Sequence, residues 1–422
     1  MMTRVLVVLP FYGGSLPVGR YCVDALREIG CLVDVFEAPE FHHSFKALKS
    51  LKVRQERLEY LENTYLKLVG EAVLTQVERF QPDLVLCMAQ APVGIPILKR
   101  LKKDGVATAM WFVEDYRLFL YWRAFAPYYD IFAVIQEAPF TEALRAVGVE
   151  NALYLPLAAQ PGVHKPLELS AADKKRFGAD LSFMGAGYPN RRQAFRQLAA
   201  YDFKIWGTEW EDEPALAPHL QMKGQRISPE DAVRIFNAAK INLNLHSGTR
   251  RDLAVTGGDF VNPRTFEIAA CGAFQLVDKR TLMLPMFEDD EVATFSSMKE
   301  LLEKVDYFLA RPEERAAFAR RGQERVLRDH TYAARMQSLL DFTAGRLPDW
   351  PRSRAGAALT EELSGLPDGL KNSLADLLAR LELPAGTDFE TLITALRQHS
   401  GALTELESAL LFLDEWKKLY KL

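Results

Sequence analysis

Arg264 and Glu267 stand three residues apart in the stretch from Asp259 to Gly272. Residues at this spacing share one face of a helix, so the guanidinium and the carboxylate can act on one ligand. Asp259 lies eight positions before Glu267, in the loop that enters the predicted helix. A cation beside two carboxylates suits a ligand that carries both phosphates and hydroxyl groups. The alternative is a surface ion pair on a packing helix, and these residues alone leave both interpretations open.

Sequence signals mark both ends of this helix. Asn262 is a good N-cap, Pro263 fits the first helical position, and Gly272 can supply the left-handed residue that ends the helix. The amide groups and the dipole at a helix start attract anions, and Arg264 adds a full charge there. We therefore predict that Asn262, Arg264 and Thr265 bind an anionic ligand.

The spacing of the two acids resembles a known motif. Seven residues separate Asp259 from Glu267, and Ala-Ala-Cys-Gly follows; this resembles the acidic motif of retaining GT-B glycosyltransferases, in which both acids are Glu. The forms Asn-Pro-Arg-x-Phe-Glu at 262–267 and Phe-Met-Gly-Ala-Gly-Tyr-Pro-Asn-Arg-Arg at 183–192 resemble the CgeB-like (spore maturation protein type) branch. The resemblance covers roughly residues 1–345. Asp259 departs from the family pattern by one methylene, which bears on its contact with the sugar.

The resemblance implies an α/β protein of GT-B fold, in which two Rossmann-like domains face a cleft. It also implies transfer of a sugar from a nucleotide diphosphate sugar to an acceptor, with retention of configuration and with neither a metal nor another cofactor. In that reaction Glu267 would accept hydrogen bonds from the donor ribose, and Asp259 from the sugar. Arg264 and Arg191 would stabilise the charge that develops on the leaving diphosphate.

A second glycine-containing loop follows a predicted strand and enters a helix. Gly185 and Gly187 match two positions of the dinucleotide fingerprint, but Asn190 stands where the third glycine belongs, so a nicotinamide cofactor is disfavoured. Arg191 and Arg192 at the helix start predict a cradle for a diphosphate. A solvated basic helix start is the alternative.

Further candidate residues follow the ends of other predicted strands, where the ligands of open α/β sheets gather. The glycines permit close backbone approach, the carboxylate could orient the acceptor, and the tryptophan could stack on a base. Each also has a purely structural interpretation: a tight turn, a loop ion pair or a core side chain. The residues are Gly13, Gly14, Asp115, Trp206, His246 and Ser247.

The composition is that of an ordinary soluble protein. The 422 residues are 49% hydrophobic and 26% charged, and the formal net charge of −4 gives no reason to expect nucleic acid. The four cysteines have no metal-ligand spacing, which indicates reduced thiols and a cytoplasmic protein. The apolar run Val5–Leu9 is too short for a membrane span, so we expect no integral membrane segment.

Apolar runs alternate with helical stretches, the pattern of parallel α/β sheets. We expect an acceptor-side domain over residues 1–156, a donor-binding domain over 167–330 and a crossover helix over 331–347. The expected strands are Val5–Leu9, Leu32–Phe36, Leu84–Met88, Ala107–Phe112, Ile131–Ile135, Ala152–Leu155, Asp180–Met184, Phe203–Trp206, Ile241–Leu245, Ala273–Val277 and Ala293–Ser296.

We expect residues 350–422 to form a helical appendage, which the resemblance does not explain. Leucines recur there at intervals of three and four residues, which predicts two amphipathic helices joined at Pro384-Ala-Gly386. Their apolar stripe could pack on the chain's own body, on another protein or on a second copy, and the last predicts a homodimer.

The sequence is compatible with three function classes. The first is a glycosyltransferase with a nucleotide-sugar donor and an unknown acceptor. The second is a sugar-nucleotide epimerase of the same architecture. The third is a noncatalytic binding or assembly protein that works through its appendage.

Overall fold

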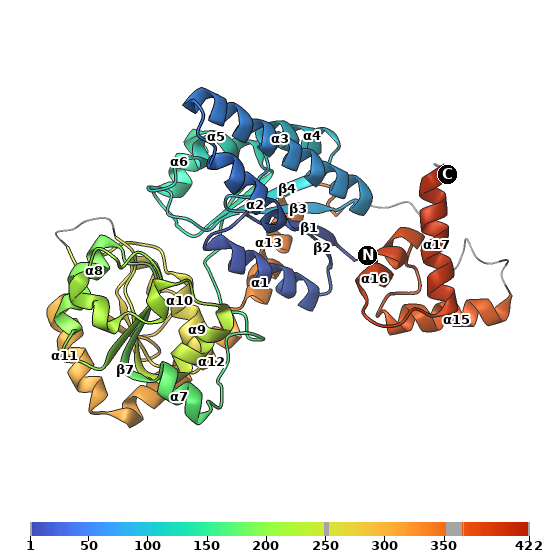
Figure 1. Ribbon diagram of the computed structural model, residues 1–422. Helices are drawn as coiled ribbons and strands as arrows, with labels where there is room; N and C mark the ends of the chain where they lie inside the picture. The colour runs from blue at the N-terminus through green and yellow to red at the C-terminus, as the bar shows by residue number, and fades with distance from the viewer. Residues whose placement is uncertain (1, 249–252, 352–364, 366, 421–422) are drawn as a thin grey trace.

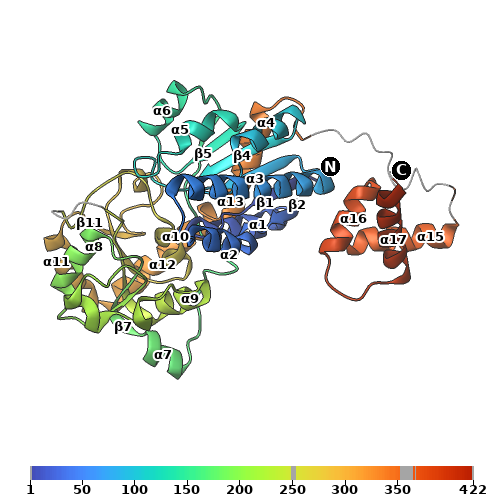
Figure 2. The same ribbon diagram turned by 45° about the horizontal axis from the view of Figure 1, so that its top comes forward.

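The computed structural model describes residues 2–248, 253–351, 365 and 367–420, and for 418–420 only the backbone. Two α/β domains lie side by side, and a small helical module sits beyond the first domain, on the side away from the second (Figure 1). Figure 2 shows the same arrangement after a 45° turn. The predicted fold class, two Rossmann-like domains of GT-B type with a helical appendage, is confirmed.

The first domain holds a six-stranded parallel sheet in the order β2-β1-β3-β4-β5-β6. Alternate residues of each strand face opposite layers: Val5 and Val7 pack towards α1, whereas Leu6 and Val8 pack towards α3. The strands are therefore covered on both faces, as their continuous apolar character predicts. Their bounds are β1 Arg4–Val8, β2 Leu32–Phe36, β3 Leu84–Met88, β4 Ala107–Phe112, β5 Ile131–Val134 and β6 Ala152–Tyr154.

The helices of this domain are α1 Ser15–Glu28, α2 Ala38–Lys49, α3 Gln55–Phe80, α4 Ile95–Lys103, α5 Trp122–Phe125 and α6 Phe140–Ala146, with a 3-10 turn at Ala126–Tyr128.

The second domain holds a five-stranded parallel sheet in the order β11-β10-β9-β7-β8. Its strands are β7 Ala179–Met184, β8 Phe203–Trp206, β9 Ala239–Asn244, β10 Gln275–Asp278 and β11 Ala293–Phe295. Its helices are α7 Ala171–Phe177, α8 Pro189–Phe195, α9 Pro229–Ala238, α10 Pro263–Ala270, α11 Met298–Leu309 and α12 Pro312–Asp329. Short 3-10 helices lie at Arg196–Leu198, Pro214–His219, Met222–Gly224 and Thr281–Met283.

Helix α10 begins and ends where its sequence signals predict. The Asn262 side chain accepts the Thr265 amide at 3.2 Å, and Gly272 has φ +63° just beyond the helix. Phe266, Ala269 and Ala270 belong to the same apolar cluster as α1 residues. The helix therefore packs where the two domains meet.

The chain returns to the first domain through α13, Tyr332–Arg346. Tyr332, Met336 and Leu339 are fully buried in the cluster that also holds Val18 and Cys22 of α1. The Arg335 guanidinium donates to the carbonyl of Pro156 at 2.8 Å. This helix ties the end of the second domain to the linker and to the first domain.

The described part of the appendage holds three helices, where two were predicted: α15 Asp368–Arg380, α16 Phe389–Gln398 and α17 Glu405–Tyr420. Leu392, Ile393 and Leu396 of α16 are buried against α15 and α17. The prediction missed α16 because it is only ten residues long and begins at an Asp388 N-cap inside what reads as a loop. Leu363 and Leu366 of the predicted stripe lie outside the described residues.

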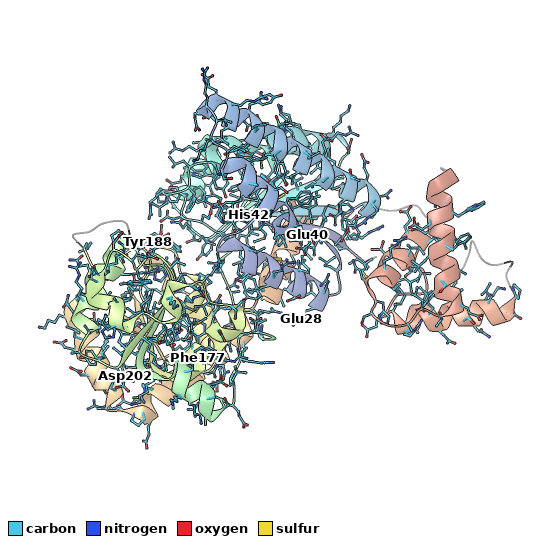
Figure 3. All side chains as sticks on the ribbon, viewed as in Figure 1. Glu28, Glu40, His42, Phe177, Tyr188 and Asp202 are labelled. Carbon is cyan, nitrogen blue, oxygen red and sulfur yellow. The ribbon has the colours of Figure 1, made fainter. Side chains whose placement is uncertain are left out.

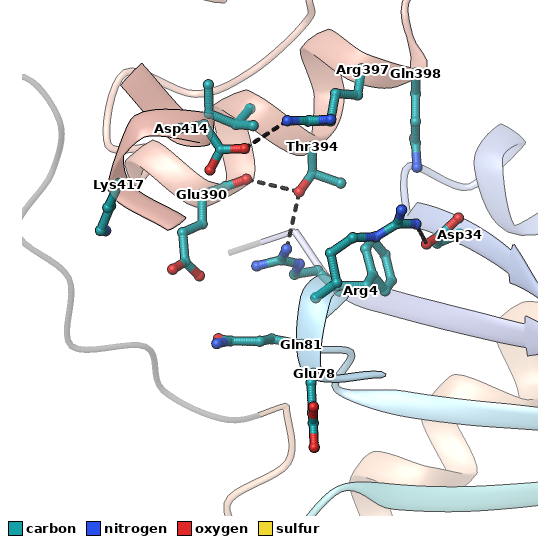
Figure 4. A pocket seen from close by; sticks show the side chains of 13 residues that line it. Arg4, Asp34, Glu78, Gln81, Glu390, Thr394, Arg397, Gln398, Asp414 and Lys417 are labelled. Atoms are coloured by element: carbon teal, nitrogen blue, oxygen red, sulfur yellow. Dashed lines mark hydrogen bonds and ion pairs between the residues drawn. The ribbon is translucent and has the colours of Figure 1, made fainter. Parts of the chain in front are cut away.

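The appendage touches the first domain near β1 and β2 through a few contacts (Figure 4). The Arg4 guanidinium donates to Thr394 Oγ1 at 3.1 Å, and the Gln398 amide donates to the Val33 carbonyl. Charged and polar residues line a cavity of about 740 Å³ between the two parts. Packing on the chain's own body is therefore present but loose. Among the described helices, none has both the length and the apolar character needed to cross a membrane.

Candidate functional site

A network of buried amides fixes the start of α10. Asn262 Nδ2 donates to Asn244 Oδ1 at 2.7 Å, and Asn244 Nδ2 donates to Thr265 Oγ1 at 3.0 Å. Gln275 of the adjacent strand donates to the Thr265 carbonyl at 2.7 Å. Thr265 is fully buried, so the structure gives it a structural role rather than the predicted ligand contact.

His246 connects this helix to strand β10. Its Nε2 accepts the backbone amide of Asn262 at 2.9 Å, so its Nδ1 carries the proton that faces Asp278 Oδ1 at 2.6 Å. Burial lowers the pKa of His246 to about 4, and the imidazole is neutral at physiological pH. The side chain is 1% exposed, so its role in the structure is to support the start of α10 from behind, through the Asn262 amide.

Asp278, which is fully buried, holds the His246 side chain in place. Burial alone would raise its pKa, but the imidazole and amide of His246 and the guanidinium of Arg280 hold the pKa at about 2. Arg280 Nη2 donates to its second oxygen. The carboxylate is therefore ionised and satisfied on both oxygens, as a buried charge must be.

Arg264 and Glu267 form the expected pair on one face of α10. Arg264 Nη1 bonds directly to Glu267 Oε2, and 35% of the arginine side chain is exposed. Glu267 is only 4% exposed, because α1 and the interdomain linker cover it. His164 Nε2 of the linker lies 3.9 Å from Glu267 Oε1, and the Tyr21 ring of α1 packs edge-on to His164. The carboxylate is therefore enclosed where the two domains meet, not open to a cleft.

Asp259 bridges the two domains. Its Oδ2 accepts from Arg117 Nη2 at 2.8 Å, and its Oδ1 accepts from Gln136 Nε2 at 2.9 Å. Despite partial burial, these bonds and the Phe260 amide keep its pKa below the usual range. Asp115 accepts the backbone amide of Arg117 at 2.9 Å, which positions the arginine for this contact.

Arg191 lies beneath the loop that follows β7. Its guanidinium donates to the carbonyls of Leu245 at 2.8 Å and Ala186 at 2.9 Å. Burial lowers its pKa to about 10, so it stays charged at neutral pH. Asn190 is fully buried and donates to the His246 carbonyl at 2.9 Å. Arg191 is thus held by the carbonyls of two loops, and Asn190 also connects two loops.

The glycines after β7 serve close backbone packing. A Cβ at Gly187 would lie 2.1 Å from the Glu209 carbonyl, and one at Gly185 would lie 3.0 Å from the Phe183 ring. This side of the sheet turns towards the first domain: Tyr188 lies at that edge in Figure 3, and Asp202 at the opposite one. The loop position suits a ligand, but Gly187 is already explained by packing.

The remaining predicted residues divide between core and cleft. Trp206 is 1% exposed and packs with Phe236, which leaves its ring no face for a base. Ser247 is half-buried beside residues 249–252, which lie outside the described part. The Gly13 carbonyl accepts from Arg226 of the second domain at 2.7 Å, and added Cβ atoms at Gly13 and Gly14 would meet open space. These two glycines therefore lie where the domains approach each other.

Sequence reasoning missed the residues that support the site. They are Asn244, Gln275, Asp278 and Arg280 behind α10, and Arg117, Gln136, His164 and Tyr21 around the two acids. A signal for the first group was present: Ile-Asn-Leu-Asn-Leu-His at 241–246 alternates with period two, which places Asn242, Asn244 and His246 on one strand face. The second group comes from the other domain and the linker, and no local pattern marks it.

Comparisons with known proteins agree with this architecture. A family model described as "Glycosyl transferase-like" matches residues 191–341, which include α10 and its entry loop. Spore protein CgeB of Bacillus subtilis (strain 168) is 28% identical over 262 residues, covering 57% of this chain and 77% of that protein. In sequence, the chain therefore resembles glycosyltransferases and the spore protein CgeB.

Solved structures support the fold of this CgeB-like chain. Anabaena HepE in complex with UDP and glucose superimposes with a TM-score of 0.56 at 11% identity, over 82% of this chain and all of HepE. Sucrose-phosphate synthase from Thermosynechococcus elongatus gives 0.53 at 13% identity, over 80% of this chain and 97% of that one. At these identities the likeness shows the fold alone.

The buried imidazole of His246 predicts how the stability of the CgeB-like chain depends on pH. Between about pH 7.5 and pH 5, His246 takes up a proton in the unfolded chain, where its pKa is 6.5, but stays neutral in the fold, where its pKa is about 4. The unfolded state binds more protons, so the free energy of unfolding falls as the pH falls, by about 2 kcal/mol for this residue.

Urea unfolding of wild type and His246→Gln at both pH values measures this effect. Between about pH 7.5 and pH 5, the free energy of unfolding of His246→Gln should fall by about 2 kcal/mol less than that of wild type. His399→Gln is the matched control, because His399 is exposed on the appendage and should leave the loss unchanged. An identical loss in wild type and His246→Gln would show that the imidazole is not held neutral.

Proposed function

We propose that the chain is a hexosyltransferase that moves a sugar from a nucleoside diphosphate sugar to an acceptor, with retention of the anomeric configuration. The observation that carries this is the Arg264–Glu267 pair at the start of α10, enclosed between the two domains. The HepE structures, which contain UDP and glucose or UDP-glucose, support the donor class.

Cleavage of the bond between the sugar and the diphosphate leaves negative charge on the departing diphosphate. Arg264 and Arg191 supply positive charge at the start of α10, where their partial burial strengthens the interaction with a leaving diphosphate. The Thr265 amide is already bonded to Asn262, so side chains rather than this amide stabilise the leaving group. Because arginines perform this task, we propose that no metal ion is required.

Donor binding must change the pairing of Glu267, which is buried against Arg264. We propose that the donor phosphates draw Arg264 away and that the ribose hydroxyls take its place on the carboxylate. Hydrogen bonds to an ionised group contribute about 1.5–3 kcal/mol, which is enough to replace a partly exposed ion pair.

The four cysteines are free thiols, which supports the proposal of a cytoplasmic protein.

The first test replaces Glu267 with glutamine, which preserves shape at a position that is 4% exposed. We expect donor affinity to fall about tenfold or more, because a neutral amide accepts ribose hydroxyls more weakly. Isothermal titration measures this, with whichever UDP-, GDP- or dTDP-sugar raises the melting temperature of the protein most. Glu313→Gln, at the exposed start of α12, is the control, and equal affinities in all three proteins would contradict the assignment.

A second test concerns the geometry of Arg264. In Arg264→Lys the charge is kept but the two-pronged contact with phosphate oxygens is lost, so we expect kcat to fall roughly tenfold or more. Arg234→Lys changes a partly exposed arginine that pairs with Asp231 on neighbouring α9, and should leave the rate unaltered. Steady-state kinetics decides: wild-type turnover in Arg264→Lys would assign the residue to the helix surface only.

We also propose that the appendage mediates self-association. Phe412, Leu413 and Trp416 on α17 are 69%, 48% and 45% exposed, and exposed apolar patches on soluble proteins commonly bind a partner. Light scattering should give a dimer for the full chain and a monomer for Phe412→Ser/Trp416→Ser. A full-length monomer at micromolar concentration would contradict this proposal.

A further inference from the structure

The first domain contains an apolar pocket that the proposed donor site does not use. Its volume is about 880 Å³, within the range of small-molecule sites. Aromatic and aliphatic side chains from helices α2, α3, α4 and α5 and from the loops after β1 and β3 form its walls: Phe11, Phe45, Phe125, Leu66, Val93 and Ile97. Tyr12, which is 52% exposed, lies at its margin. Such a lining favours a ligand with a substantial apolar part.

The pocket lies at the carboxyl-terminal edge of the first sheet, the edge that faces the second domain. Tyr12 belongs to the loop after β1, and the next residue, Gly13, contacts Arg226 of the second domain at 2.7 Å. Gln90, after β3, also lines the pocket, and its side chain bonds to Glu114. Glu114 directly precedes Asp115 in the loop whose Arg117 reaches Asp259. A ligand in the pocket therefore lies next to the interdomain site.

Polar groups border the apolar walls on one side. Asn63, Lys67 and Glu71 recur every four residues along α3, so they form one row on the helix face that lines the pocket. A polymer composed only of sugars could stack its rings on the aromatic side chains, but it has no continuous apolar segment to fill the space beside Leu66, Val93 and Ile97. An amphipathic molecule matches both surfaces, because its apolar part fills the walls and its polar part reaches the rim.

We propose that this pocket is an acceptor subsite for an amphipathic small molecule, whose alkyl or aromatic group is held here while a hydroxyl-bearing head group extends to the donor. The inference rests on the proposed function. In the transfer, the acceptor oxygen bonds to the anomeric carbon, the bond from that carbon to the diphosphate oxygen breaks, and the hydroxyl proton leaves with the diphosphate.

The test compares methyl and octyl β-glucoside as probes by calorimetry on the full chain, with octyl glucoside kept below its micelle concentration. Each buried methylene strengthens binding about threefold to fourfold, so octyl glucoside should bind at least thirtyfold more tightly than methyl glucoside. Leu66→Gln should weaken octyl glucoside about tenfold. Leu68→Gln, the same change two residues along α3 on a side chain that is 62% exposed and outside the pocket, should alter it less than about twofold.

A second variant guards against a folding defect in Leu66→Gln. A Cβ at Gly94, which lines the pocket, would meet only Pro96 at 3.6 Å, so Gly94→Leu fills space without backbone strain and should also weaken octyl glucoside. Equal binding of the two glucosides, or equal effects of Leu66→Gln and Leu68→Gln, would overturn the subsite and favour a polar glycan or peptide acceptor. Nucleotide-sugar binding, measured on the same proteins, separates that result from failure of the proposed donor site.

Discussion

The position of helix α10 depends on one buried carboxylate. Asp278 is ionised at a fully buried position, and it holds His246 through both the backbone amide and Nδ1. The other ring nitrogen of His246 then accepts the amide of Asn262, the residue that caps α10. A buried charge without partners would be costly, so the carboxylate, the imidazole and the helix start are fixed together. Arg264 and Glu267 lie within the first two turns of that helix, and their placement follows from this chain of contacts.

The same constraint explains why polar residues occupy the interior of this sheet. Strands β9 and β10 run parallel, with Gln275 opposite Asn242 and Val277 opposite Asn244. The amide side chains of Asn244 and Gln275 bond to each other and to Thr265 instead of packing as an apolar layer. The hydrogen bonds of a fully satisfied network fix the orientation of its side chains, whereas aliphatic packing only fills the available space. The geometry of the candidate site therefore depends on buried residues that lie behind it.

The sequence predicted what local patterns encode. Apolar runs located the strands, and Asn262, Pro263 and Gly272 defined α10 from end to end. His246 lies just after a strand and Trp206 ends one, as ligand-binding residues often do, yet both are buried, because position at a strand end does not determine which way a side chain points. The partners of Asp259 come from residues more than a hundred positions away, and such contacts have no local signature. Helix α16 was missed for a different reason, since a ten-residue helix between two longer ones shows too few periods.

The two acids of the motif lie in different surroundings. Glu267 is on α10, whereas Asp259 lies in the loop before the helix, where it contacts the other domain. Glu267 is enclosed on α10, whereas Asp259 accepts hydrogen bonds from Arg117, Gln136 and the Phe260 amide. A carboxylate offers about four acceptor positions, and these three bonds leave one for a sugar hydroxyl. Contacts to the first domain and to a donor sugar can therefore coexist on Asp259. In the proposed function, sugar binding and the approach of the two domains would be linked through a single side chain. The shorter aspartate would suit this role because its carboxylate stays close to the backbone that Phe260 and Leu282 fix.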